Sequence, residues 1–267
     1  MPTSRHSPLE PVDPLPEPPA LPGTVLVRPT REDAIDTAAH ELFTHAMDCV
    51  RTFGDFHLAL SGGSTPLPLY ERLMIDPQFR DLPWRRTHLW IVDERRVGFD
   101  DDRCNYKHIE QIIVQHSGIP PEQVHPIHAT TPNADLQYER LLRETLAWRE
   151  KGHDRLDYAL LGMGGDAHTA SLFPHSPALD APSDRLIVAN SGPTVTPPDR
   201  ITMTYTLLNA TRLLAVLVTG ASKAETLRQV AARAHTGDYR SMPILGVKPI
   251  GGVLRWYLDA EAAGRPA

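Results

Sequence analysis

The sequence predicts a doubly wound α/β domain, in which helices cover both faces of one mostly parallel sheet. Short runs of consecutive apolar residues, including 56–60 and 213–218, have the length and composition of strands buried on both faces. Each run is followed by a glycine-containing loop and then by a helical pattern, an order that is typical of parallel sheets. The chain has 267 residues, 41% of them hydrophobic, and is long enough to enclose such a core.

The first 22 residues differ from the rest of the chain. They contain eight of its 26 prolines, and few of their side chains are suited to a core. We therefore expect residues 1–23 to form a disordered or polyproline-like tail and residues 24–267 to form a single domain. Such a tail is either an inert extension, the simpler interpretation, or a docking peptide for a proline-binding module.

The domain is expected to begin with an amphipathic helix after Thr30. Thr30 and Asp33 have the spacing of a capping box. Apolar side chains then recur at helical intervals: Ala34, Ile35, Ala38, Ala39, Leu42, Phe43, Ala46, Met47 and Val50. Residues 56–60 form the next strand, which ends at a serine and two glycines, and Pro66 occupies a position that the first turn of a helix tolerates.

The order of strand, loop and helix recurs three times. Residues 87–92 precede a charged loop and a helix near 106–115, residues 156–161 precede a glycine-rich loop, and residues 213–218 precede a helix that ends near 234. Weaker strand patterns near 186–189, 201–204 and 253–258 are expected to extend or flank the sheet. The sequence shows no internal repeat and no second domain boundary.

Composition argues against several classes of function. Lys and Arg number 27 against 33 Asp and Glu, and the net charge of −6 disfavours nucleic acid or an anionic membrane as the main partner. The longest apolar run, 213–218, is far shorter than the roughly 18 residues of a membrane-spanning helix. Two cysteines cannot form a disulfide framework. We expect a cytoplasmic protein that is a monomer or a small homo-oligomer.

The loop after residues 56–60 is a candidate phosphate cradle, because ligands of open α/β sheets bind at the carboxyl ends of the strands. It supplies Gly62, Gly63, Ser64 and Thr65 just before a helix, and glycines let backbone N–H groups approach a phosphate. An ordinary tight turn is the alternative.

Cations lie in or near the other strand-end loops. Arg95, Arg200 and Lys223 have the charge that a phosphate requires, although each alone is also typical of a solvated surface.

Asp166 and His168 share the glycine-rich loop after residues 156–161. A histidine can act as a general base near neutral pH, and a neighbouring carboxylate can orient it. Alternatively, Asp166 caps a turn and His168 packs against its surroundings. Asp93 and Glu94 are further acid–base candidates, or else partners of the arginines that follow them.

Other kinds of site lack support. Gly162, Gly164 and Ala167 mimic a dinucleotide fingerprint, but Pro174 interrupts the helix that should follow. The histidine pairs and the acidic run 100–102 lack a metal-ligand pattern. No G-x-S-x-G nucleophile motif and no reactive-cysteine context is present. We expect neither a metal nor a cofactor, and the residues alone indicate a phosphorylated small molecule and an Asp/His acid–base pair.

In this order, the loops resemble those of the 6-phosphogluconolactonase family, which shares a superfamily with glucosamine-6-phosphate deaminases. The resemblance covers roughly residues 25–263. Its matching stretches are 60–66, 92–95, 105–107, 162–174, 198–202, 218–220, 223–224 and 256–259. After His168 the chain continues Thr-Ala-Ser-Leu-Phe-Pro, which is the lactonase form, where the deaminases have Ile-Ala-Phe-Asn-Glu-Pro.

The resemblance implies hydrolysis of 6-phospho-D-glucono-1,5-lactone to 6-phospho-D-gluconate, the second step of the oxidative pentose phosphate pathway, with no required cofactor. His168 would activate the attacking water and Asp166 would support it or the substrate hydroxyls. We expect backbone N–H groups of the glycine loops to stabilise the oxyanion. The expected substrate-binding residues are Gly62, Gly63, Ser64, Thr65, Asp93, Arg95, Gly164, Arg200 and Lys223.

Two positions depart from the family pattern. Ala167 stands where the family usually has glycine, and if this residue needs a positive φ the alanine costs on the order of 1 kcal/mol. Val97 and Gly98 stand where Val-Pro is commoner. Two other functions stay open: an amino-sugar-phosphate isomerase/deaminase, and a non-catalytic sugar-phosphate-binding protein.

Overall fold

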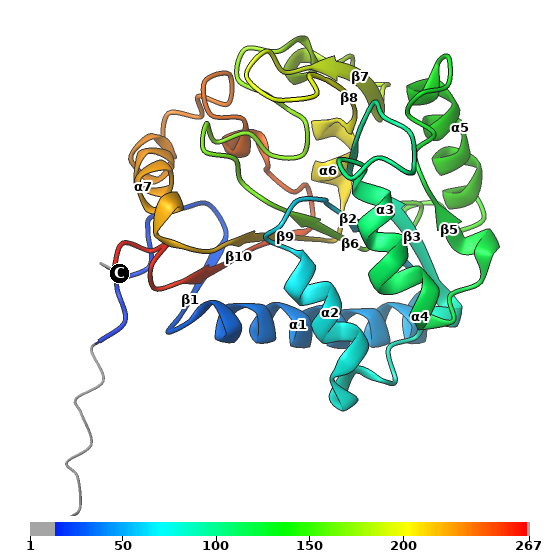
Figure 1. The fold of residues 1–267 in the computed structure, drawn as a ribbon, viewed down its shortest axis with the longest axis horizontal. Coiled ribbons are helices and arrows are strands. Elements are labelled where there is room, and N and C mark those ends of the chain that lie inside the picture. The colour runs from blue at the N-terminus through cyan, green and yellow to red at the C-terminus, as the bar shows by residue number, and fades with distance from the viewer. Residues whose placement is uncertain (1–13, 266–267) are drawn as a thin grey trace, which may run out of the picture.

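The computed structural model describes residues 14–265, and its centre is a seven-stranded sheet whose neighbouring strands are all parallel (Figure 1). In spatial order the strands are β1 (Thr24–Arg28), β10 (Val253–Asp259), β9 (Leu213–Val218), β6 (Tyr158–Leu161), β2 (Phe56–Leu60), β3 (Thr87–Ile91) and β5 (Val124–His125). Every residue of β2, β6 and β9 is buried, as a sheet covered on both faces requires. The predicted doubly wound α/β fold is confirmed.

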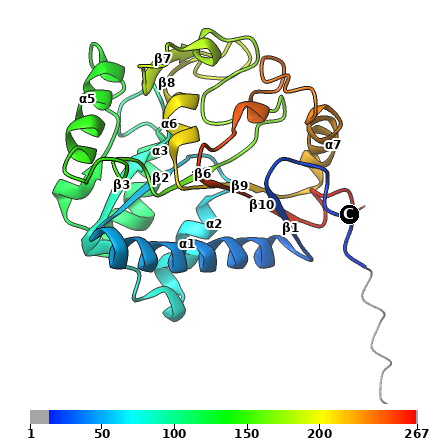
Figure 2. The same cartoon turned by 180° about the vertical axis from the view of Figure 1, so that it is seen from behind.

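Helices cover both faces of this sheet (Figures 1 and 2). Helix α1 (Arg31–Phe53) runs across one face with α2 (Leu67–Ile75) packed against it, and α6 (Tyr205–Ala210) lies over the other face. Helix α3 (Asn105–Ile109) continues through a π-helical segment (Glu110–Val114) into α4 (Gln115–Ser117). The other α-helices of the described residues are α5 (Ala134–Leu146) and α7 (Ala224–Arg233).

Helix α1 begins where its capping residues predict. Thr30 Oγ1 accepts a hydrogen bond from the backbone N–H of Asp33 at 3.1 Å, and Asp33 Oδ2 accepts one from the N–H of Thr30 at 3.2 Å. Gly54 follows the helix with φ of +90°, a conformation that glycine adopts without strain. Local sequence therefore determines both ends of the longest helix among residues 14–265.

A second, antiparallel sheet corrects one expectation and decides between the two alternatives of another. It consists of β4 (Asp93–Arg95), β8 (Asp199–Met203) and β7 (Ile187–Ser191), in that order. The charged segment after residue 92, expected to be a loop, is a strand that pairs with the segment near 201. The segment near 187 pairs in turn with the segment near 201, so both segments flank the main sheet instead of extending it. The chain leaves the main sheet at Val92, whose N–H binds the carbonyl of Leu60 while its own carbonyl accepts from the N–H of Met203 at 2.9 Å.

The segment before β1 packs against the domain. Leu21 is buried, and the indole N–H of Trp256 donates to the carbonyl of Pro22 at 2.8 Å, so contact with the domain begins before residue 24. The first 13 residues of the predicted tail lie outside the described residues. Among residues 14–265, no helix is both long and apolar enough to cross a membrane.

Candidate active site

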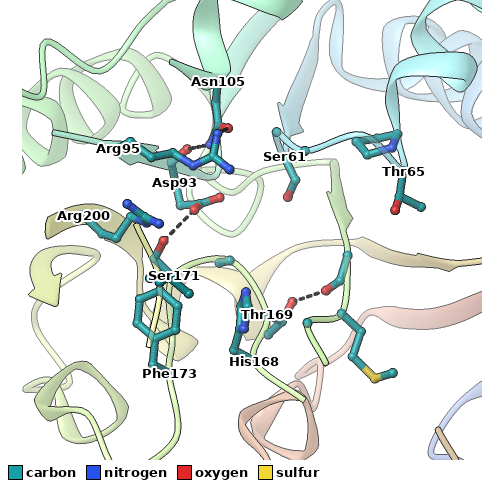
Figure 3. A pocket seen from close by; sticks show the side chains of 18 of the residues that line it. Ser61, Thr65, Asp93, Arg95, Asn105, His168, Thr169, Ser171, Phe173 and Arg200 are labelled. Atoms are coloured by element: carbon teal, nitrogen blue, oxygen red, sulfur yellow. Dashed lines mark hydrogen bonds between the residues drawn. The ribbon is translucent and has the colours of Figure 1, made fainter. Parts of the chain in front are cut away.

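A cavity of about 470 Å³ opens where β2 and β6 end, beside β4 (Figure 3). Ligands of open α/β sheets bind in this position. Nine of the eleven residues expected from the sequence line it: Gly62, Gly63, Ser64, Thr65, Asp93, Arg95, Gly164, His168 and Arg200. The other two, Asp166 and Lys223, lie outside its lining.

The loop after β2 forms one wall and is fixed from both sides. The Ser61 hydroxyl donates to the carbonyl of Leu160 at 2.7 Å, and the Tyr70 hydroxyl of α2 donates to the carbonyl of Ser61 at 2.6 Å. Strand β6 and helix α2 thereby hold the loop in place, with Ser64 and Thr65 facing the cavity just before α2.

Glycine is required in this wall for two different reasons. Gly63 has φ of +92°, where other residues are strained. Gly62 has an ordinary φ, but a Cβ there would lie 1.7 Å from Oδ1 of Asn105. Gly62 therefore leaves room for a side chain from α3, which is a different reason from the phosphate approach expected for this position.

Two arginines stand opposite each other in the second sheet. Arg95 of β4 and Arg200 of β8 are paired in register, and both side chains line the cavity (Figure 3). Burial lowers the pKa of Arg200 below its ordinary value, because the attraction of Asp93 does not offset burial together with the repulsion from Arg95. Like charges directly opposite each other destabilise a sheet, so this pair favours a bound anion.

The carboxylate of Asp93 is held by a hydroxyl on the opposite wall. Ser171 Oγ donates to Asp93 Oδ2 at 2.6 Å (Figure 3), and the backbone N–H of Ser171 donates to Thr202 Oγ1 at 3.1 Å. Asp93 thus joins β4 to the loop that carries His168.

Glu94 points away from the cavity. It is 1% exposed, and its carboxylate accepts from the backbone N–H groups of Arg95, Asn105 and Tyr106 at 2.7–2.8 Å. Burial raises the pKa of Glu94 despite these hydrogen bonds. Of the two roles considered for Glu94, acid–base group and arginine partner, the structure provides neither: its carboxylate caps the first turn of α3.

His168 and Asp166 form a pair at the other side of the cavity. His168 Nδ1 lies 2.5 Å from Asp166 Oδ1, and a Cβ on Gly164 would lie 2.1 Å from the same nitrogen. Partial burial disfavours the charged Asp166 carboxylate, but its hydrogen bonds and the attraction of a protonated His168 ring outweigh burial and lower the pKa of Asp166. Asp166 therefore contacts the candidate base without lining the cavity.

Ala167, which stands where the family usually has glycine, has the positive φ that strains residues other than glycine. Its φ is +62°, in the left-handed region, and its side chain is buried. The N–H of Ile244 donates to the carbonyl of Ala167 at 3.0 Å, which holds the residue in this conformation. The alanine thus carries backbone strain directly beside His168.

Lys223 contacts the glycine-rich loop but does not line the cavity. Its ammonium donates to the carbonyl of Met163 at 2.8 Å, and the neighbouring Thr226 hydroxyl donates to the carbonyl of Gly165 at 2.9 Å. Lys223 was expected to contact the phosphate, both from its strand-end loop and from the family resemblance; in the structure its ammonium donates to a loop carbonyl and the residue lies outside the cavity lining.

One group of described residues has the spacing of metal ligands, at the opposite, amino-terminal ends of β2 and β3. It comprises Asp55, His57 and His88. The indole N–H of Trp90 donates to His57 Nδ1 at 3.1 Å, so a neutral His57 carries its proton on Nε2, the nitrogen that faces Asp55. Arg149 already neutralises Asp55 at 2.5 Å. These donors do not fit a metal.

Several lining residues were not predicted as site residues: Ser61, Pro66, Asn105, Gly162, Met163, Thr169, Ala170, Ser171, Phe173, Val195 and Thr196. Most of them adjoin a predicted residue, so proximity in the sequence was an available signal. Asn105 is different, because it begins a helix ten residues after Arg95 and reaches the cavity only through the fold; its signal was its place in the stretch 105–107 that matches the family.

The chain is similar in sequence and in fold to known proteins. A family model described as glucosamine-6-phosphate isomerases/6-phosphogluconolactonase matches residues 29–256. A 6-phosphogluconolactonase of Haemophilus influenzae is 33% identical over 235 residues, which is 88% of this chain and 96% of that protein. The solved structure of a Thermotoga maritima 6-phosphogluconolactonase has a TM-score of 0.74 and 26% identity, covering 88% of this chain and 99% of that one.

Mammalian relatives are longer. The human GDH/6PGL endoplasmic bifunctional protein is 37% identical over 246 residues, which is 89% of this chain. This chain spans 30% of the length of that protein and 29% of its rabbit counterpart. The match of the family model over most of the sequence, together with the fold and the cavity, shows that the chain belongs to the glucosamine-6-phosphate isomerase/6-phosphogluconolactonase family.

Proposed function

We propose that this protein hydrolyses 6-phospho-D-glucono-1,5-lactone to 6-phospho-D-gluconate. One observation carries the proposal: a single cavity of about 470 Å³ has a pair of arginines on one wall and a histidine held by a carboxylate on another. A phosphorylated sugar lactone has the matching groups, a dianion at one end and an electrophilic carbonyl at the other. Relatives named 6-phosphogluconolactonase support the same substrate.

The phosphate is proposed to bind between Arg95 and Arg200, with the hydroxyls of Ser64 and Thr65 completing its surroundings. A dianion would neutralise the two facing guanidinium groups, and an arginine can bind two phosphate oxygens at once. Lys223 is left out of this set because it does not line the cavity.

The proposed base is Nε2 of His168. Because the Asp166 carboxylate can only accept a hydrogen bond, the neutral imidazole carries its proton on Nδ1 and keeps the lone pair of Nε2 free. Asp166 then orients the ring and stabilises the imidazolium that forms. Gly164 leaves space for this arrangement, since any side chain at that position would overlap the ring.

The reaction follows from these roles. Nε2 of His168 takes a proton from water as the water oxygen attacks the lactone carbonyl, and backbone N–H groups of the glycine loops are proposed to stabilise the tetrahedral oxyanion. The intermediate then expels the ring oxygen, which takes the proton back from His168 as the C–O bond breaks. The product acid loses a proton to solvent.

A covalent intermediate on cysteine is not part of this mechanism. Burial raises the pKa of Cys49 to about 12 and that of Cys104 to about 11, with nearby carboxylates adding to the effect. Both thiols are buried and neutral near pH 7, and a neutral thiol is a poor nucleophile. A positioned base provides about 10²–10⁴-fold in rate, which is sufficient for an activated ester.

We further propose that the protein acts in the cytoplasm as a monomer or small homo-oligomer, with residues 24–267 as its catalytic domain. Two free, buried cysteines and a net charge of −6 support a reducing compartment and a small-molecule substrate. Size-exclusion chromatography with light scattering tests the oligomeric state, and a large assembly would contradict it.

The substrate is tested by supplying two candidates side by side. Freshly generated 6-phosphogluconolactone is coupled to 6-phosphogluconate dehydrogenase, and glucosamine 6-phosphate is assayed for ammonium release. We expect 6-phosphogluconate to form from the lactone faster than by spontaneous ring opening, and no ammonium to be released from glucosamine 6-phosphate. Ammonium release would identify a deaminase, and binding of 6-phosphogluconate without turnover would identify a sensor.

A further inference from the structure

Asn105 joins three walls of the cavity. It is the first residue of α3 and is 1% exposed. Its side chain contacts the loop after β2, where only a glycine at position 62 leaves room for it, and it also binds two groups of β4. A side chain in this position affects the loop, the strand and the helix together.

The two ends of the Asn105 amide are assigned by their partners. Oδ1 accepts from Nη1 of Arg95 at 2.5 Å, and Nδ2 donates to the backbone carbonyl of Asp93 at 2.7 Å. A guanidinium can only donate and a carbonyl can only accept, so the reverse orientation of the amide would lose both hydrogen bonds. The amide is therefore held at both ends.

The position of Asn105 is in turn determined by Glu94. The buried carboxylate accepts from the backbone N–H of Asn105 at 2.7 Å and from that of Arg95 at 2.8 Å. It thus connects the strand residue that carries the guanidinium to the helix residue that holds it. Charge-assisted hydrogen bonds of this kind are among the strong ones.

We propose that Asn105 is a positioning residue, which directs the guanidinium of Arg95 toward the phosphate of the substrate. This inference rests on the proposed function for the identity of the anion. In the structure Nη1 of Arg95 also donates to the carbonyl of Arg103 at 2.8 Å, on an exposed segment. Without Asn105 we expect the guanidinium to keep this outer partner alone and to lose its fixed position beside Arg200.

The test is a double-mutant cycle with Asn105→Ala and Arg95→Ala. Two quantities are measured: the affinity for inorganic phosphate by calorimetry, and KM and kcat for 6-phosphogluconolactone. We expect Asn105→Ala to weaken phosphate binding and to raise KM by about 10-fold or more, while kcat changes by less than about 3-fold. In the Arg95→Ala background the same change should have almost no further effect.

Asn209→Ala is the matched control. Asn209 also bridges two backbone groups, donating to the carbonyl of Gly246 at 3.0 Å and accepting from the N–H of Lys248 at 2.7 Å, and it lies outside the cavity lining. It should lower the unfolding temperature without changing KM or phosphate affinity. If Asn209→Ala and Asn105→Ala shift KM equally, a general loss of stability explains both and the proposal is wrong.

Glu94→Gln is the second variant. It preserves the shape of the side chain, but its NH2 group must face at least one of the three backbone donors, Tyr106 if the amide oxygen keeps Arg95 and Asn105. It should therefore disturb the start of α3, where Asn105 lies, and reproduce part of the rise in KM if the variant folds. If Asn105→Ala acts as strongly in the Arg95→Ala background as in the unsubstituted protein, Asn105 does not act through Arg95. Phosphate affinity is measured independently of turnover, so a protein without lactonase activity still confirms or overturns the inference.

Discussion

Arg95 and Arg200 stand directly opposite each other on neighbouring antiparallel strands, and both side chains line the same cavity. The repulsion between them is an electrostatic cost of the ligand-free protein that a bound dianion removes. This relationship connects the second, small sheet to function, because it is the sheet that brings the two guanidinium groups together.

Inorganic phosphate should therefore stabilise the protein. At a concentration near 100 times its dissociation constant, a ligand of the folded state contributes about 2.7 kcal/mol, which thermal unfolding detects as a higher Tm. In Arg200→Met the gain should be much smaller. Sulfate, which has a similar shape and charge, serves as a second probe, whereas an equal rise of Tm with sodium chloride would indicate a general salt effect.

Ala167→Gly should stabilise the protein. Alanine at φ of +62° is strained by about 1–2 kcal/mol, and the added freedom of glycine in the unfolded chain offsets about 0.4–1 kcal/mol of the gain. Urea unfolding should show a higher midpoint with an unchanged slope. The exposed helical residue Ala232 is the control, since its replacement by glycine should cost about 1 kcal/mol. A lower midpoint for Ala167→Gly would contradict the strain.

Gly164→Ala and Gly165→Ala should differ sharply in activity. A Cβ at 164 would lie 2.1 Å from Nδ1 of His168, whereas a Cβ at 165 meets nothing within 4 Å and Gly165 has no positive φ. We expect the first change to displace the base and to lower kcat by at least about 100-fold, and the second to retain most activity. An equal loss of activity in the two variants would show that the loop needs its glycines for flexibility and not to leave room for the His168 ring.

Stability should fall in mildly acidic solution because of two stacked histidines. His88 Nδ1 and His125 Nε2 lie 3.1 Å apart, and burial, with repulsion from neighbouring histidines, lowers the pKa of His88 to about 4 and that of His125 to about 3. The unfolded chain takes up protons below about pH 6.5 and the folded protein only below about pH 4, so stability is lost between these values.

The variant His88→Gln isolates this effect from the titration of carboxylates. Urea unfolding at pH 7.0 and pH 4.5 should show a smaller loss of stability in the variant than in the unsubstituted protein. Parallel losses in the two proteins would mean that His88 does not contribute to acid sensitivity.

Much of the site was predictable because parallel strands end at one edge of their sheet. The loops that carry Ser64 and His168 follow β2 and β6 directly, so an ordinary rule of α/β folds brings them together. The helix cap at Thr30 was equally predictable, since its hydrogen bonds connect residues three apart in the chain.

The unpredicted features depend on contacts between distant segments. Arg200 faces Arg95 only because β4 and β8 pair outside the main sheet, and no local pattern specifies that pairing. The long side chain of Lys223 starts at a strand end but reaches a loop carbonyl, a direction that its position in the sequence does not determine. Gly62 lines the cavity as expected, but the fold also needs a glycine there to leave room for Asn105, a contact that no local pattern specifies.

The central claim is that His168 activates water for hydrolysis of the lactone. The most direct measurement is a time course with fresh 6-phosphogluconolactone, coupled to 6-phosphogluconate dehydrogenase and corrected for spontaneous ring opening, with the unsubstituted protein and with His168→Ala. Circular dichroism confirms that the variant is folded. The account predicts a clear excess rate that falls by about 10²–10⁴-fold in His168→Ala. A variant that retains most of the excess rate, or an unsubstituted protein that shows none, would contradict it.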